Sequence, residues 1–111
     1  ATDMQAAMDK LRDLPADTLV YCGHEYTVDN CRFARAVEPG NAALAARAEA
    51  ALALRERGER TLPSTLGEEL AVNPFLRTRE PAVVAAALVQ DPDAAPGAAT
   101  MKAVRDWKDR F

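Results

Sequence analysis

The chain has 111 residues, a net charge of −3 and only 5% aromatic residues. This length suits one domain, or part of one, with a modest core, and the slightly acidic balance argues against a general nucleic-acid binder. We expect no transmembrane segment and no signal peptide, because no apolar run is long enough for the first and no suitable leader opens the chain. Cys22 and Cys31 form neither a disulfide framework nor a CxxC metal pair, so a reducing, cytoplasmic setting is expected.

The first predicted element is a helix over residues 2–14. Thr2 and Gln5 stand at capping-box spacing, and Pro15 ends the helix. Its predicted inward face consists of apolar side chains at helical spacing, namely Met4, Ala7, Met8, Leu11 and Leu14. The uninterrupted run TLVYC that follows, residues 18–22, predicts a strand covered on both faces.

The rest of the chain is predicted to be helical, with breaks at EPGN, NP and DPDAAPG. Side-chain caps are expected from Thr27, Asn41 and Thr65, and Gly58 suits a helix C-terminus. The expected helices run from about Thr27 to Val37, Asn41 to Gly58, Thr65 to Asn73, Pro81 to Gln90 and Ala98 to Phe111. In the last one, the side chains expected to face inward are Met101, Val104, Trp107 and Phe111.

The predicted elements include a single strand among five or six helices, so the strand has no predicted partner in a sheet. A lone strand leaves both edges unpaired, so the apolar run at residues 19–22 requires a sheet that this chain does not supply. The chain also opens directly at a helix start, without methionine. We therefore expect it to be the C-terminal piece of a longer protein, with its strand completing a sheet encoded upstream.

His24, the only histidine, follows the predicted strand, where α/β proteins often place chemistry. Three interpretations stay open. It is a hydrogen-bonded structural residue, or one ligand of a metal site that needs about three, or the partner of Cys22 in a nucleophile pair. The last is disfavoured by strand geometry, and Cys22 is more simply a small buried apolar residue.

Three blocks in order carry a family resemblance: LVYCGHEYTVDNCRFARAVEPGN, PSTLGEELAVNPFLR and MKAVRDWKDRF. The chain resembles the C-terminal part of glyoxalase II, hydroxyacylglutathione hydrolase, over essentially its whole length. The resemblance implies a mainly α fold: residues 1–25 would be the last helix and strand of an α/β metallo-β-lactamase (αββα) domain, and residues 26–111 an all-helical substrate-binding domain. It also implies hydrolysis of S-D-lactoylglutathione to glutathione and D-lactate, as in methylglyoxal detoxification.

The same resemblance implies a centre of two divalent metal ions, most simply zinc, with iron or manganese as alternatives. His24 would be a ligand of one ion, and the other ligands, an HxHxDH motif among them, would lie upstream. Two such cations generate hydroxide at neutral pH and polarise the thioester carbonyl. His24 would hold a metal and would not be the base. On this basis the fragment alone is expected to be inactive.

Substrate-binding residues are also implied. Tyr26 matches the family's glutathione-contacting tyrosine, while Arg105 and Lys108 match a basic pair that engages the glycine end of glutathione. From the residues alone, Arg105 and Lys108 share a helix face that could equally be solvated, since Asp106 and Asp109 are interleaved with them. Phe33 matches a family position near the ligand but is as readily explained as a core residue.

Partner expectations follow from the same resemblance. The substrate would be a small-molecule glutathione thioester, the helices would pack on an upstream metallo-β-lactamase domain, and the enzyme would be a monomer without nucleic-acid or membrane partners. The competing class is a non-catalytic, truncated helical module that binds glutathione or a protein partner. An HxHxDH motif encoded upstream of Ala1 would discriminate the two.

Overall fold

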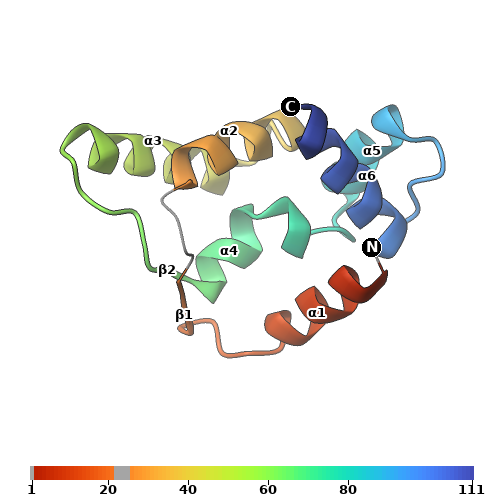
Figure 1. The fold of residues 1–111 in the computed structure, drawn as a ribbon, viewed down its shortest axis with the longest axis horizontal. Helices are drawn as coiled ribbons and strands as arrows, with labels where there is room; N and C mark the ends of the chain where they lie inside the picture. The colour runs from red at the N-terminus through yellow and green to blue at the C-terminus, as the bar shows by residue number, and fades with distance from the viewer. Residues whose placement is uncertain (1, 22–25) are drawn as a thin grey trace.

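The computed structural model describes residues 2–21 and 26–111. The fold of these residues is mainly helical, as predicted, with one short antiparallel strand pair (Figure 1). In chain order the elements are α1 (Thr2–Arg12), β1 (Leu19–Val20), α2 (Thr27–Val37), α3 (Ala42–Glu56), β2 (Ser64–Thr65), α4 (Leu66–Val72), the 3-10 helix η1 (Pro74–Leu76), α5 (Pro81–Gln90) and α6 (Ala98–Arg110).

Local capping signals were the most dependable guide to helix ends. The Asn41 side chain accepts from the backbone N–H of Leu44 and starts α3, and Thr65 accepts from the N–H of Glu68 and starts α4. Gly58 follows α3 with a φ of +72°, a conformation that glycine adopts at little cost. Thr27 is an exception. It is the first residue of α2 rather than its cap, and its hydroxyl accepts a hydrogen bond from Thr61.

The predicted strand is shorter than expected and is paired within this chain. Leu19 lies opposite Thr65 and Val20 opposite Ser64, so β2 covers one edge that the sequence left open. Leu19 is 55% exposed, so the prediction of a strand covered on both faces is wrong for the described residues. No sequence pattern indicated β2, because a two-residue polar strand directly before a helix has no periodicity to detect.

Helix α1 also presents a different face to the protein than its apolar pattern predicted. Of the five predicted inward residues, Met4 and Met8 are half-buried, whereas Ala7, Leu11 and Leu14 are exposed, and α1 ends at Arg12. Gln5 is buried instead: its Oε1 accepts from the Thr78 hydroxyl at 2.7 Å and its Nε2 donates to Asp9, so it does not form the predicted capping box with Thr2.

An exposed ion pair reinforces the attachment of α1. Arg79 donates twice to the Asp9 carboxylate, at 2.7 and 3.1 Å, and these bonds lower the pKa of Asp9 below its usual range. Figure 1 shows α1 along one side of the molecule, with α4 between it and the α2–α3 pair. Polar side chains therefore help to hold α1 against the other helices, while Ala7 and Leu11 of its apolar stripe remain at the surface.

The core has two parts that share α2. One joins α2 to α5 and α6, where Phe33 is 2% exposed and makes an edge contact with Trp107 at 5.6 Å between ring centroids. The other joins α2 to α3 and α4 through Cys31, Leu44 and Val72. Phe33 is thus a core residue. Phe111, predicted to face inward, is 60% exposed although its ring touches that of Phe33.

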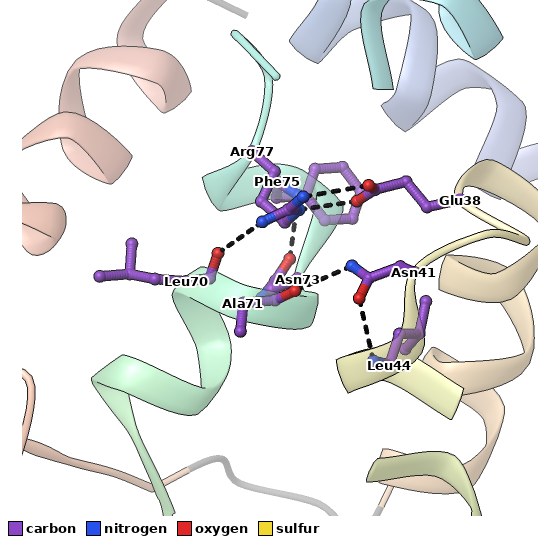
Figure 2. A network of polar contacts seen from close by, with 8 residues as sticks. All are labelled: Glu38, Asn41, Leu44, Leu70, Ala71, Asn73, Phe75 and Arg77. Carbon is purple, nitrogen blue, oxygen red and sulfur yellow. Dashed lines mark hydrogen bonds and ion pairs between the residues drawn. The ribbon is translucent and has the colours of Figure 1, made fainter. Parts of the chain in front are cut away.

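A polar network ties the end of α2 to the segment after α4 (Figure 2). Arg77 donates from Nε and Nη2 to both carboxylate oxygens of Glu38, at 2.6 and 3.0 Å, and from Nη1 to the carbonyl of Leu70. Asn41 donates to the carbonyl of Ala71 at 2.9 Å. The hydrogen bonds from Arg77 to Glu38 raise the pKa of Arg77 further above its ordinary value. The VEPGN and NPFLR blocks are therefore in direct contact.

Within the part of the chain that the structure describes, no helix combines the length and apolar character needed to cross a bilayer.

Candidate functional site

A cavity of about 130 Å³ lies where α2, α3, α4, η1 and α6 meet. Its apolar lining includes Phe33, Leu44, Val72 and Phe75, and its polar lining includes Asn30, Arg47, Glu69 and Lys108. Mixed linings of this kind suit a small organic molecule, because apolar contacts supply affinity and a few polar groups fix its orientation.

Lys108 is the exposed one of the two cations, Arg47 and Lys108, that line this cavity. Its Nζ donates to Oδ1 of Asn30 at 3.0 Å and lies 5.8 Å from the centroid of the Phe75 ring. An ammonium carries three donors, so Lys108 can bind an incoming carboxylate while it keeps Asn30 as a partner. Of the two predicted basic residues, Lys108 is the one that the structure places at the cavity.

Arg105 lies one turn earlier on α6 and is exposed. Arg105 is not one of the described residues that line the cavity. Tyr26, at the N-cap of α2, is 58% exposed and is likewise outside the lining, although the next residue, Thr27, belongs to it. Of the three predicted substrate residues, the structure therefore places only Lys108 in the lining of this cavity.

Asn30 is a candidate that the sequence did not single out. Its backbone N–H donates to the Tyr26 carbonyl at 2.8 Å, which places it in the first turn of α2, and its side chain pairs with Lys108 from a position 78 residues away. The one sequence signal that could have pointed to Asn30 is its spacing of four residues from Tyr26, which puts the two on the same helix face.

His24 and Cys22 lie outside the described residues, so neither the metal-ligand nor the nucleophile-pair interpretation is tested by the structure. Within residues 2–21 and 26–111, no group of three or more His, Cys, Asp or Glu side chains is arranged to hold a metal ion.

Cys31 lies in the cavity wall, 6% exposed. Burial raises the pKa of its thiol, so the side chain is a protonated, weakly polar packing group at neutral pH rather than a nucleophile.

The comparisons with known proteins agree with the family resemblance of the three sequence blocks quoted above. The family described as "Hydroxyacylglutathione hydrolase C-terminus" matches residues 25–111. The chain is 57% identical over 108 residues to a hydroxyacylglutathione hydrolase of Cupriavidus taiwanensis, covering 97% of this chain and 41% of the relative. It is 50% identical over 109 residues to that of Pseudomonas fluorescens, covering 97% and 43%, and 49% identical over 107 residues to a probable hydroxyacylglutathione hydrolase of Schistosoma mansoni, covering 96% and 42%.

The chain thus spans about two fifths of the length of the curated relatives it matches. The match includes the α2 residues and the α6 lysine that meet at the cavity edge. The resemblance to glyoxalase II is confirmed, and the chain belongs to the hydroxyacylglutathione hydrolase C-terminus family.

Proposed function

We propose that this chain is the C-terminal part of a hydroxyacylglutathione hydrolase, which hydrolyses S-D-lactoylglutathione to glutathione and D-lactate, and that its role is to bind the glutathione portion. The observation that carries the proposal is the position of Lys108, an exposed ammonium at the edge of a cavity, beside Asn30 and above Phe75. Under this proposal the enzyme works as a cytoplasmic monomer.

Recognition of glutathione requires cations, because the peptide carries two carboxylates. Lys108 would engage the glycine carboxylate, with Arg105 adding charge from one turn away on α6. A charge-assisted hydrogen bond of this type contributes roughly 1.5–3 kcal/mol. Tyr26, exposed at the start of α2, would contact the peptide closer to its thioester. The chain would thus position the thioester rather than break it.

The proposal includes two divalent metal ions, zinc most simply and iron or manganese as alternatives, with His24 as one neutral imidazole ligand. When bound, such a pair supplies a hydroxide nucleophile and polarises the thioester carbonyl. The remaining ligands would come from the metal-binding part of the longer enzyme.

The surface of α1 and β1 supports attachment to such a part. Leu11, Leu14, Leu19 and Tyr21 are between 44% and 72% exposed, which is unusual for large apolar side chains that follow one another along one segment. The rest of the metallo-β-lactamase domain, packed on this segment, would remove them from water. The polar contacts of Gln5 and Asp9 would then hold that domain to the helices.

Activity of the joined protein tests the proposal. We expect the chain alone to show no hydrolysis of S-D-lactoylglutathione with added zinc, and a chimera to be active in which this chain replaces the matching segment of the Cupriavidus taiwanensis relative. Hydrolysis is followed by release of the glutathione thiol. Turnover by the chain alone would refute the first expectation. A folded chimera without turnover would favour the non-catalytic module instead.

The proposed metal role of His24 has a test that does not depend on activity. We expect the chimera to retain less divalent metal after His24→Ala than before, because one imidazole ligand is lost and catalytic sites use about three protein ligands per ion. Metal content after dialysis is measured by mass spectrometry on the same protein preparations. Equal metal content in the two proteins would contradict the assignment.

A further inference from the structure

A chain of hydrogen bonds centred on Glu69 joins β2 to η1. The Ser64 hydroxyl donates to Oε1 of Glu69 at 2.7 Å, and Nδ2 of Asn73 donates to Oε2 at 3.0 Å. The same Asn73 side chain accepts from the backbone N–H of Phe75 at 2.9 Å, and Figure 2 shows Asn73 beside Phe75. Glu69 therefore bridges two segments through its two carboxylate oxygens.

The two ends of this series of hydrogen bonds, Ser64 and Phe75, are fixed to different parts of the protein. Ser64 is 2% exposed and sits in β2, which is paired with β1. Phe75 stacks on Phe33 at 6.5 Å between ring centroids and lies 5.8 Å from Nζ of Lys108. A displacement of η1 relative to β2 would therefore move the ring that supports the Lys108 ammonium.

We propose that Glu69 is a positioning residue for the Lys108 site. Through Asn73 it holds η1 at a fixed distance from β2, so that the Phe75 ring stays beneath Nζ of Lys108. The geometric part of this inference stands on the contacts above. Its consequence for substrate binding rests on the proposed function.

An electrostatic role is the alternative, because Glu69 lines the same cavity as Lys108 and carries charge. Glutamine separates the two roles. Its Oε1 can accept from Asn73 while its Nε2 donates to the Ser64 hydroxyl, which can accept as well as donate. Glu69→Gln thus removes the charge and keeps both bridges, whereas Glu69→Ala removes both.

The direct test is the NMR signal of the Lys108 ε-methylene protons in this chain. The Phe75 ring current should shift them upfield in the wild type. We expect Glu69→Ala to move them toward the values of a free lysine and Glu69→Gln to leave them in place. Glu68→Ala is the matched control: the same change on the same helix, at a half-exposed carboxylate whose ion-pair distance to Arg47 is 3.7 Å.

Ser64→Ala breaks only one of the two bridges. It tests the positioning role if Glu69→Ala fails to fold, as shown by the loss of its helical circular dichroism signal. A shift in Glu69→Ala or Ser64→Ala that Glu69→Gln does not share supports the positioning role. The positioning role would be overturned by unshifted Lys108 signals in folded Glu69→Ala and Ser64→Ala. Equal shifts in Glu69→Ala and Glu69→Gln would overturn it as well.

The chimera supplies the functional readout. We expect Glu69→Ala to raise KM for S-D-lactoylglutathione about two- to fivefold with kcat unchanged, the equivalent of an exposed cation–π contact, and Glu69→Gln to retain the wild-type KM. If the Lys108 signals move and KM does not, the positioning role stands, and the assignment of Lys108 to substrate binding fails. The two proposals are therefore separable.

Discussion

Glu38→Ala is expected to lower the free energy of unfolding of this chain by about 3 kcal/mol. Removing one partner of a buried ion pair typically costs about 3–5 kcal/mol, because the other charge is left without compensation. The lower end applies since the Arg77 side chain keeps 18% of its surface exposed, against 6% for Glu38. Chemical denaturation, monitored by circular dichroism, measures the change.

Two further variants identify the cause. Adding Arg77→Ala to Glu38→Ala should cost less than the sum of the single changes, because the unpaired charge is removed with its partner. Asp9→Ala removes the acid of an exposed two-bond pair with Arg79 together with the acceptor of Gln5 Nε2, and its loss should still be smaller. Equal losses for Glu38→Ala and Asp9→Ala would show that burial of the pair contributes nothing.

Lys108→Ala in the chimera should raise KM for S-D-lactoylglutathione strongly while changing kcat little. A remote carboxylate is bound alike in the ground and transition states, so its loss appears in KM. Removing a charge-assisted contact of roughly 1.5–3 kcal/mol corresponds to about a ten- to hundredfold fall in kcat/KM. Arg105→Ala should act in the same direction and less strongly, because Lys108 and not Arg105 lines the cavity in the described residues.

Lys102→Ala is the matched control for these variants. It is the same substitution on the same helix, at an exposed lysine whose Nζ pairs with Asp106 at 2.9 Å, and it should leave KM unchanged. The effect of Lys108→Ala should also shrink with thioesters that lack the glycine carboxylate. If Lys108→Ala and Arg105→Ala leave the kinetics of the glutathione thioester untouched, the two residues are only a solvated helix face.

Short-range signals in the sequence settled most of the helices. Asn41, Thr65 and Pro81 mark starts of α3, α4 and α5 because a cap or a proline acts on the backbone within one turn. The inward positions Met101 and Val104 of α6 are fully buried, as their spacing predicted. The order of the family blocks, from VEPGN to MKAVRDWKDRF, was also sufficient to identify the family.

Contacts between distant residues were decided only by the tertiary structure. The apolar stripe of α1 predicted its buried face only in part: Met4 and Met8 are half-buried, while hydrogen bonds from Thr78 and Arg79 turn the face of Gln5 and Asp9 toward the protein and leave Leu11 exposed. The β1–β2 pairing joins residues 45 or so positions apart and has no periodic signature of its own.

The candidate site shows the same division. The residues alone marked Arg105 and Lys108 as two basic residues on one helix face. They did not show whether that face binds substrate or is only solvated. Folding brings Asn30, Phe75 and Lys108 together from three separate elements, and this juxtaposition distinguishes Lys108 from Arg105. Helix periodicity specifies which side chains share a face, whereas the packing of α6 against α2 and η1 specifies what that face meets.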